Sequence, residues 1–432
     1  MIKNLVKKII VFLLEWEARL VLARFRPKIV AVTGTVGKTS TKDAVFAVLS
    51  HSFFVRKSQK SYNSEIGLPL TILGCDNAWN NPILWLRNLF DGLFLLIGRE
   101  PYPEWLVLEV GVGHPGDMRR LARWLKIDAV IFTRFGNLPV HIEFFKSISH
   151  LIEEKSFLLK ALKKDGLLVL NADDAKVLEL RKSVNQRAIT FGFSTEADVV
   201  ASQSNILYRK DEVIPEGINF RIDCNGKSLP VNMEDVFGQN HVYAGLAALA
   251  FAYGQKINLL SAVEALRRYD TPPGRMRLIE GLKGSWIIDD TYNSSPTALD
   301  ASLETLREIK CSGRKLAVLG DMLELGKHTV EAHRAAGRKA AGIVDTLVVV
   351  GKRAHGFIDG ALAINFDSGK IKEFEDARLA GKFIEGMLEK GDLVLIKGSQ
   401  SMRMERAVEE IMARPEDKEK LLVRQEQEWL KR

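Results

Sequence analysis

Cysteines and long apolar runs are scarce in this sequence of 432 residues. The three cysteines, Cys75, Cys224 and Cys311, lie far apart. So few thiols exclude a disulfide framework and a cysteine-rich zinc site, and they are typical of a protein of the reducing cytoplasm. No apolar run approaches the ~20 residues that span a bilayer, which excludes a polytopic membrane protein. The sequence also has no internal repeat and no low-complexity tract, which excludes a collagen-like fibre.

Charge is ordinary in amount but uneven in position. Charged residues make up 27% of the chain and the net charge is +8. Residues 1–28 contain seven Lys and Arg against two Glu, a net charge of +5, so the other 404 residues carry only +3. A nucleic-acid-binding protein more often has basic stripes with interleaved aromatics on its folded body. We therefore expect no nucleic-acid partner.

The basic N-terminal segment, residues 1–27, is also apolar. Three- and four-residue spacing predicts a helix with one apolar face, formed by Leu5, Ile9, Phe12, Leu13, Trp16 and Leu20. No small-residue cleavage site follows, so we do not expect a signal peptide. The helix packs on the next domain or lies on an anionic membrane at its inner, cytoplasmic face. A second apolar stretch, Pro82–Ile97, leaves the same two alternatives open.

The remaining chain alternates between apolar strands and helical segments, which predicts an α/β fold with a mostly parallel sheet. The expected strands of the first half are Lys28–Thr33, Leu106–Val110, Ala129–Thr133 and Leu167–Leu170, and the expected helices include Gln239–Tyr253 and Leu259–Arg268. Short polar segments between about 195 and 235 predict a small antiparallel excursion. This central domain is expected to cover residues 28–270.

The segment Thr271–Gly274 (TPPG) is the best domain boundary, because proline and glycine stop the preceding helix. A smaller, Rossmann-like α/β domain is expected over residues 271–432, with strands at Trp286–Asp289, Leu316–Leu319, Thr346–Val350 and Leu393–Ile396. The highly charged residues Pro415–Arg432 predict a solvated helix. The chain is expected to be a monomer.

Residues 30–41 read VAVTGTVGKTST and place a glycine-rich loop between a buried strand and a helix. Glycines at 34 and 37 would let backbone N–H groups approach phosphate oxygens at the helix N-terminus. Lys38 could reach the β- and γ-phosphates, and the Thr39 hydroxyl could ligate Mg²⁺. The spacing departs from the common GxxxxGK[ST] form, because position 32 is Val. The alternative is a strand–helix turn that happens to contain lysine.

Three further residues are candidates for a metal site. Glu109 ends an apolar strand, where open α/β sheets place their ligands. His141 follows the next strand, and Lys155 lies in a helical segment. Each has an ordinary alternative: a structural acceptor for Glu109, a loop residue for His141, and half of a helical ion pair for Lys155.

Ten motifs in order from about residue 28 to 413 resemble those of the Mur ligases, the ATP-dependent amide ligases of peptidoglycan synthesis, and within them the D-alanyl-D-alanine-adding type. The motifs are VTGTVGKTST, YNSEIGLPLTIL, LVLEVGVGHPGDM, FGNLPVHIEFFKSISHLIEEK, GLLVLNADD, GQNHVYAGLAALA, PPGRMR, IIDDTYNSSP, VLGDMLELG and LIKGSQSMRME. They span over 85% of the chain.

The resemblance implies a role for each matching position. ATP would be bound by Gly34, Thr35, Gly37, Lys38, Thr39, Ser40, Asn240, Arg275, Asp290 and Asn293. Mg²⁺ would be held by Thr39, Glu109, His141 and Lys155, the last as a carbamate. The muramyl-peptide acceptor and D-Ala-D-Ala would lie near Asn63, Asp321, Glu324, Lys397 and Ser399. The catalytic set would be Lys38, Glu109, His141, Lys155 and Arg275.

Two features depart from the family pattern. The family usually has His then Asn in the adenine-side helix, whereas this chain has Asn240 then His241, which leaves the adenine role of Asn240 open. Only 27 residues precede the first strand, where the resemblance implies a uridine-binding domain. The basic apolar helix stands in its place.

The resemblance implies a two-step ligation through an acyl phosphate. Two other functions stay open: another ligase of the superfamily with a different substrate, for example a lipid-linked one, and a nucleotide-binding scaffold at the membrane without turnover. Intact Lys38, Glu109, His141 and Lys155 argue against the scaffold.

Overall fold

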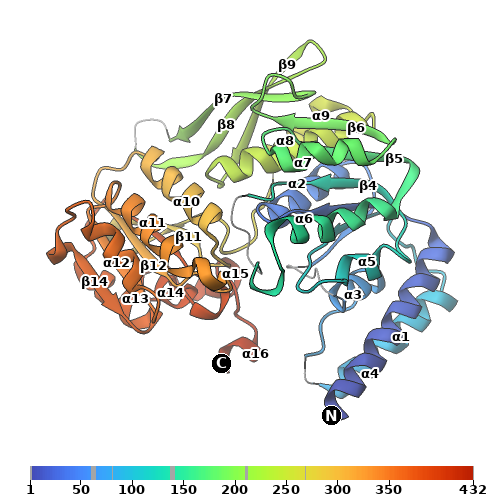
Figure 1. Ribbon diagram of the computed structural model, residues 1–432, viewed down its shortest axis with the longest axis horizontal. Coiled ribbons are helices and arrows are strands. Elements are labelled where there is room, and N and C mark those ends of the chain that lie inside the picture. Colours follow the sequence, from blue (N-terminus) through green and yellow to red (C-terminus); the bar gives the residue numbers. More distant parts are fainter. Residues whose placement is uncertain are drawn as a thin grey trace.

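The computed structural model contains two β-sheets side by side, each covered by helices on both faces (Figure 1). It describes residues 2–59, 65–79, 81–136, 142–209, 213–267 and 269–431. Two of the expected site residues, Asn63 and His141, lie outside these ranges. The predicted α/β class, with a mostly parallel first sheet and a smaller second unit, is confirmed.

The first sheet has nine strands in the order β2-β3-β1-β4-β5-β6-β7-β8-β9. Its strands are β1 (Lys28–Thr33), β2 (Val55–Lys57), β3 (Trp105–Glu109), β4 (Ile127–Phe132), β5 (Leu162–Asn171), β6 (Arg187–Gly192), β7 (Val199–Tyr208), β8 (Pro215–Cys224) and β9 (Lys227–Glu234). Pairing is parallel from β2 to β7 and antiparallel from β7 to β9. The antiparallel excursion expected between 195 and 235 is therefore confirmed.

Two apolar layers sandwich the first sheet. One face packs against α2 (Lys38–Ser50), α8 (Gln239–Gly254) and α9 (Leu259–Arg267). The other packs against α1 (Ile2–Phe25), α3 (Gly67–Leu73), α5 (Asp117–Leu121) and α6 (Ile148–Ser156), and α4 (Pro82–Ile97) lies beside α1. Strands buried on both faces read as continuous apolar runs, which is why the sequence identified them.

The second sheet has six strands in the order β10-β11-β15-β12-β13-β14. They are β10 (Arg277–Glu280), β11 (Trp286–Asp290), β12 (Lys315–Gly320), β13 (Thr346–Val350), β14 (Ile371–Phe374) and β15 (Leu393–Lys397). One face carries α10 (Pro296–Glu308), α11 (Thr329–Ala341) and α12 (His355–Leu362), and the other carries α13 (Ala377–Met387) and α14 (Glu405–Ile411). The expected boundary at Thr271–Gly274 falls between α9 and β10.

The prediction of a solvated helix over Pro415–Arg432 is wrong. The segment contains two short helices, α15 (Lys418–Leu421) and α16 (Gln427–Leu430), with Leu422 and Arg424 buried between them. The Arg424 guanidinium donates to the buried Glu405 carboxylate at 2.6 Å and to the Thr291 carbonyl at 2.6 Å. The charges that suggested solvent exposure are thus partly used inside the protein.

The N-terminal helix forms as predicted. Of its predicted apolar face, Ile9, Phe12 and Trp16 are exposed, and the side chain of Leu5 lies outside the described part of the chain. The residues that pack inward are Val11, Leu14, Ala18 and Val21. The helix is apolar on more than one side, so spacing alone did not identify the buried stripe. In the described part of the chain, no helix combines the length and apolar character needed to cross a membrane.

Candidate active site

The phosphate loop lies at the centre of the first sheet, where strand order reverses. Strand β1 pairs with β3 on one side and β4 on the other, so the loop that follows it opens at a topological switch point. At Gly34, with φ +143°, a Cβ would lie 2.0 Å from the Thr133 Oγ1, so only glycine fits. Gly37, with φ +83°, begins α2 without a side-chain cap, which leaves the helix N-terminus to a bound anion.

Thr39 joins three parts of the chain. Its hydroxyl donates to the Glu109 Oε2 at 2.9 Å, and the Arg275 Nη2 donates to its Oγ1 at 3.1 Å. The Ser58 Oγ accepts the Glu109 backbone N–H at 3.2 Å and so fixes the end of β3. A hydroxyl, a carboxylate and a guanidinium from the loop, the neighbouring strand and the second unit therefore converge.

Two lysines lie beside the loop, and both are disfavoured as cations. The Lys38 Nζ donates to the Thr35 carbonyl at 3.4 Å. Burial lowers the pKa of Lys38, the Glu109 charge opposes that shift, and the Arg275 charge adds to it. Lys155 of α6 is buried, and its Nζ donates to the Gly34 carbonyl at 2.6 Å. Burial, and then the charge of Lys38, lowers the pKa of Lys155 well below its usual range.

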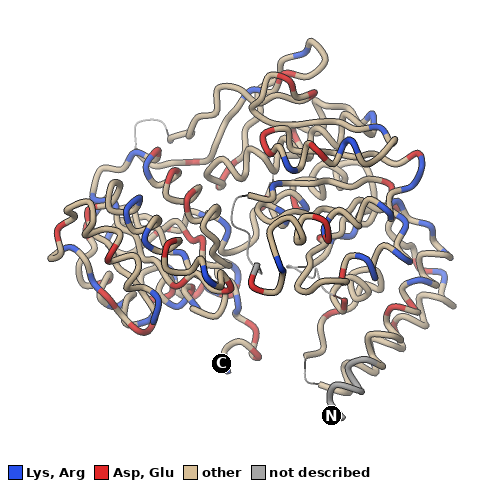
Figure 2. Tube along the Cα trace, in the orientation of Figure 1, with Lys and Arg blue, Asp and Glu red and all other residues tan. Residues whose placement is uncertain are grey.

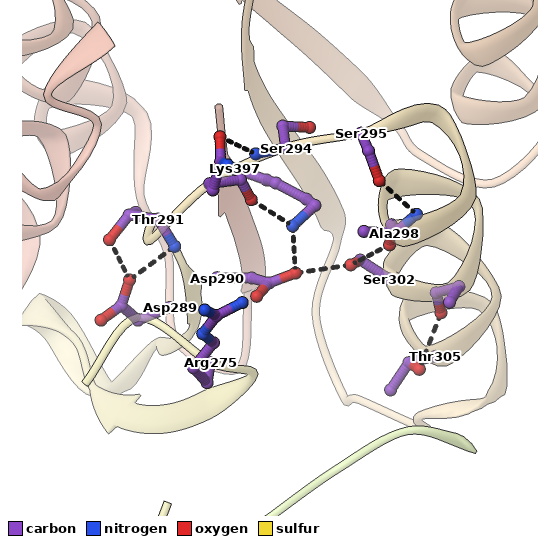
Figure 3. A network of polar contacts seen from close by, with 12 residues as sticks. Arg275, Asp289, Asp290, Thr291, Ser294, Ser295, Ala298, Ser302, Thr305 and Lys397 are labelled. Carbon is purple, nitrogen blue, oxygen red and sulfur yellow. Dashed lines mark hydrogen bonds and ion pairs between the residues drawn. The ribbon is translucent and has the colours of Figure 1, made fainter. Parts of the chain in front are cut away.

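The second unit contributes a buried ion pair at the carboxyl ends of β11 and β15 (Figure 3). The Lys397 Nζ lies 2.6 Å from the Asp290 Oδ2 and donates to the Asn293 carbonyl at 2.9 Å. The Ser302 hydroxyl donates to the same Asp290 oxygen at 2.6 Å. Burial lowers the pKa of Lys397, and the Asp290 charge opposes the shift. Asp290 is thereby held in one orientation.

Two cavities meet at the phosphate loop. The first, about 690 Å³, lies between the two units, and the second, about 540 Å³, lies between the loop and α1. The first is lined by the expected residues Thr35, Gly37, Lys38, Thr39, Ser40, Glu109, Asn240, Arg275, Asp290, Asn293, Glu324, Lys397 and Ser399. Thr35 and Lys38 also line the second cavity, together with Lys155. Lys38 therefore stands at the junction.

Among the expected residues that the structure describes, two do not line either cavity. Gly34 belongs to the phosphate loop, but its carbonyl oxygen points to Lys155, from which it accepts a hydrogen bond. The Asp321 carboxylate accepts the Arg353 backbone N–H, at 3.1 Å for its Oδ1, and its backbone carbonyl accepts the Ser399 N–H at 3.0 Å. Asp321 thus orders loops beside the first cavity, a supporting position that the motif alone did not distinguish from a ligand contact.

Asn240 and His241, whose order is swapped relative to the family pattern, differ in burial. Asn240 lines the first cavity, while His241 is buried and its Nε2 lies 3.1 Å from the Arg275 carbonyl oxygen. Burial lowers the pKa of His241 to about 4, so the imidazole is neutral. His241 therefore holds the backbone that presents Arg275.

Sequence reasoning missed several supporting residues. Ser58 and Thr133 brace the phosphate loop and β3, and Ser302 orients Asp290. Lys42 is fully buried on α2, with its Nζ donating to the Ser58 carbonyl at 2.8 Å. Serine and lysine at these places carry no distinctive spacing, so only the folded chain shows their partners.

The oxygen-rich side of the loop fits a hard divalent cation. The Thr39 hydroxyl and Glu109 carboxylate are the kinds of ligand that Mg²⁺ takes, completed by phosphate and water. Within the described ranges, no group of three His, Cys, Asp or Glu side chains could hold a metal ion. A metal here would therefore use the nucleotide's own oxygens.

The comparisons assign the fold to a class. The family model "Mur ligase middle domain" matches residues 32–82 and 93–252, and "Mur ligase, glutamate ligase domain" matches residues 274–400. The chain belongs to the Mur ligase family and is an ATP-dependent carbon–nitrogen ligase.

Three relatives show which ligases of this family the chain resembles. The chain is 27% identical to the UDP-N-acetylmuramoyl-tripeptide–D-alanyl-D-alanine ligase of Bacillus subtilis (strain 168), covering 93% of this chain and 79% of the relative. The Escherichia coli (strain K12) ligase of the same name is 26% identical over 92% of this chain and 78% of the relative. The MurF ligase of Thermotoga maritima, solved in complex with ADP, superposes with a TM-score of 0.75 at 27% identity, over 93% of this chain and 83% of that one.

Proposed function

We propose that this chain joins D-Ala-D-Ala to the terminal carboxylate of a muramyl tripeptide at the expense of ATP. The observation that carries the proposal is the position of Lys38, which lines both cavities where they meet. ATP would lie in the first cavity with its phosphates on the loop. The acceptor peptide would lie in the second with its carboxylate toward Lys38.

The geometry supports a two-step reaction. A carboxylate oxygen attacks the γ-phosphorus of ATP, the bond to the β-phosphate oxygen breaks, and an acyl phosphate and ADP form. The amine of D-Ala-D-Ala then attacks the acyl carbon, phosphate leaves, and the amine loses a proton. Lys38 and Arg275, on two sides of Thr39, would offset the charge that develops on the phosphoryl oxygens.

Mg²⁺ would be held by Thr39 and Glu109, and when bound it neutralises phosphate charge. We propose that Lys155 is carbamylated. Its burial and the nearby Lys38 favour a neutral amine, the form that reacts with CO₂. The nitrogen would bond to CO₂ and lose a proton to solvent, and the resulting carbamate anion beside Lys38 would favour the charged form of that lysine. His141 stays a candidate ligand outside the described residues.

The second unit would bind the ribose and the incoming amine. Asp290 would accept from the ribose hydroxyls, while Glu324, Lys397 and Ser399 line the same cavity nearer the junction. The segment Thr271–Gly274 would act as the hinge by which this unit, residues 271–432, closes on the central domain, residues 28–270. We propose that the enzyme acts as a monomer.

The carrier of the muramyl peptide is the open part of the proposal. The second cavity is walled on one side by Glu15 of α1, with Arg120 and Trp124 nearby. The Arg120 Nη2 lies 3.1 Å from the Glu15 Oε2. Because α1, which forms this wall, also exposes Ile9, Phe12 and Trp16, a lipid-linked acceptor is an alternative to a UDP-linked one.

Phosphate release tests the proposal. Purified protein receives Mg-ATP with UDP-linked or lipid-linked muramyl tripeptide, with and without D-Ala-D-Ala. Release that needs both the acceptor and the amine supports the ligase, and the better carrier identifies the acceptor. Release with neither, or with a different amine only, contradicts it. A nucleotide-binding scaffold would show ATP binding without turnover in every arm.

A further inference from the structure

Helix α4 exposes most of its large apolar side chains. It buries Asn88 and Gly92, and Trp85, Leu89, Leu95 and Leu96 pack partly buried against the core. The other large apolar side chains face solvent, among them Phe94 at 67% and Ile97 at 80% exposure. The exposed set is Ile83, Leu84, Leu86, Phe90, Leu93, Phe94 and Ile97. Since such a contiguous apolar surface is costly in water, it indicates a binding surface.

Helix α1 continues this surface. The two helices run side by side in the same direction, as Figure 1 shows at the blue end of the chain. A Cβ at Gly92 would lie 2.3 Å from the Glu17 carboxylate, and the Arg24 guanidinium donates to the Gly98 carbonyl at 2.6 Å. Outside this contact, α1 exposes Ile9, Phe12 and Trp16. We call α1 and α4 together the helical pair.

Most of the helical pair lies outside the part of the chain that the family models match. The middle-domain match begins at residue 32 and omits residues 83–92, so it excludes α1 and most of α4. Of the described residues of the two helices, none lines the first cavity and only Glu15 lines the second. Nucleotide binding therefore gives no reason for the apolar exposure.

Charge indicates the partner. Figure 2 shows that the described length of the helical pair carries few charges. The N-terminal turns of α1, however, contain Lys3, Lys7 and Lys8 and no acidic residue before Glu15. On α4, Arg87 is exposed, with Asp91 3.6 Å away. A helix whose sequence begins with three lysines and whose following turns expose apolar side chains is complementary to an anionic lipid surface.

We propose that the helical pair docks the enzyme on an anionic lipid bilayer, lying in the interface with its apolar side chains among the acyl chains. At 16 residues, α4 is too short to span the ~20-residue hydrocarbon core, so it lies on the bilayer. A second copy of the chain is a poorer occupant, because the described acidic residues of the helical pair are already engaged: Glu15 pairs with Arg120, Asp91 lies 3.6 Å from Arg87, and Glu17 is buried. Docking would hold the side of the second cavity that Glu15 of α1 lines next to the bilayer. The inference does not depend on the proposed ligase reaction.

Vesicle flotation tests the proposal with the full chain. Vesicles of phosphatidylcholine containing phosphatidylglycerol should carry the protein upward at low salt, and pure phosphatidylcholine vesicles should carry less. The double variant Phe90→Ser/Phe94→Ser should bind the anionic vesicles at least about tenfold more weakly, because it loses two large apolar side chains from the interface. High salt should weaken binding by the wild type.

A matched control comes from the second unit. Val330 and Leu379 have exposed fractions of 58% and 54%, similar to those of Phe90 and Phe94. They lie on α11 and α13, away from the helical pair. Val330→Ser/Leu379→Ser should float like the wild type. Binding lost equally in both double variants would overturn the assignment to the helical pair.

A second measurement does not depend on the serine variants. Brominated phosphatidylcholine mixed into anionic vesicles should quench tryptophan fluorescence of the wild type, and Trp16→Phe should remove part of that quenching.

Two results of the flotation experiment would overturn the proposal: failure of the wild type to float, or vesicle binding by Phe90→Ser/Phe94→Ser that equals that of the wild type. A dimer in lipid-free solution that this variant converts to monomer, without vesicle binding, would identify a second copy as the occupant.

Discussion

At the scale of single residues, the site places two lysine amines around one loop. Lys155 donates to the Gly34 carbonyl behind the loop, and Lys38 donates to the Thr35 carbonyl in front of it. Burial disfavours the charged form of both amines. An anionic substrate bound beside Lys38 would favour the charged form of that amine and would in turn be neutralised by it.

Lys38→Ala should lower kcat by at least about 100-fold, because it removes the cation at the junction of the cavities. The melting temperature should not fall, since a desolvated ammonium with a lowered pKa does not stabilise the fold. Steady-state phosphate release and thermal unfolding measure both. Near-normal turnover in this variant would refute the phosphate-loop assignment.

Lys155→Ala and Lys155→Arg should both lose most activity, by about 100-fold or more. Arginine keeps a cation but does not form the proposed carbamate. Wild-type protein incubated with ¹³C-bicarbonate should show a carbamate carbon in its NMR spectrum that is absent from Lys155→Arg. A fully active Lys155→Arg enzyme would leave Lys155 with a structural role only.

The phosphate-loop residues could be named from sequence because strand, glycines and lysine are contiguous, so local chemistry defines the loop. Asp321 could not be separated from Glu324 in this way, because its role depends on a contact with Arg353 in another loop. Likewise, Ser58 became identifiable only when folding placed its hydroxyl on the Glu109 N–H.

At the scale of elements, the helical pair shows where periodicity is insufficient. Strands β1, β3, β4 and β13 were predictable as apolar runs buried on both faces. Strands β2 and β14 were not, because they are short, half-buried and at sheet edges. Helix α1 has apolar residues on several sides, and only its packing on α3 and α4 selects the buried stripe.

Glu17 makes the packing of α1 dependent on pH. Its carboxyl is buried against Gly92, its Oε2 has no hydrogen-bond partner among the described residues, and burial raises its pKa from 4.5 to about 7. The folded protein holds this proton more tightly than the unfolded chain does. Stability should therefore fall as the pH rises from about 4.5 to 7, and the loss should be complete above that window.

Glu17→Gln should remove this dependence. The variant should be more stable than the wild type at pH 8, by on the order of 1–3 kcal/mol, and the difference should shrink toward pH 5. Urea unfolding of both proteins at several pH values measures it. Glu15→Gln, on the same helix with its carboxylate paired to Arg120, is the control and should keep the wild-type dependence of stability on pH, because it retains Glu17. Equal pH profiles for wild type and Glu17→Gln would contradict the assignment.

At the scale of the whole molecule, two sheets are joined so that one covers the switch point of the other. The link runs through residues 269–276, between α9 and β10. The Trp79 and Trp429 rings, from the two units, also meet edge to face at 6.2 Å. The shape of the first cavity therefore depends on the relative position of the two units, and the sequence motifs of neither unit specify that position.

Arg275 couples the units most directly. Its guanidinium donates to Thr39 in the first unit and lies over the Tyr292 ring in the second, 4.0 Å from the ring centroid. Arg275→Lys keeps the charge but loses the planar fork and the ring stacking. We expect kcat to fall by about 10- to 100-fold, with a smaller change in the affinity for ATP, because the variant positions the phosphoryl group less well.

Arg277→Lys, two residues further along the chain, serves as the control and should retain near-normal turnover. The Arg277 guanidinium lies 3.6 Å from the Asp270 carboxylate. Single-turnover measurements with saturating acceptor separate the chemical step from binding. An Arg275→Lys enzyme with unchanged kcat would show that the link between the units is structural and that Arg275 takes no part in phosphoryl transfer.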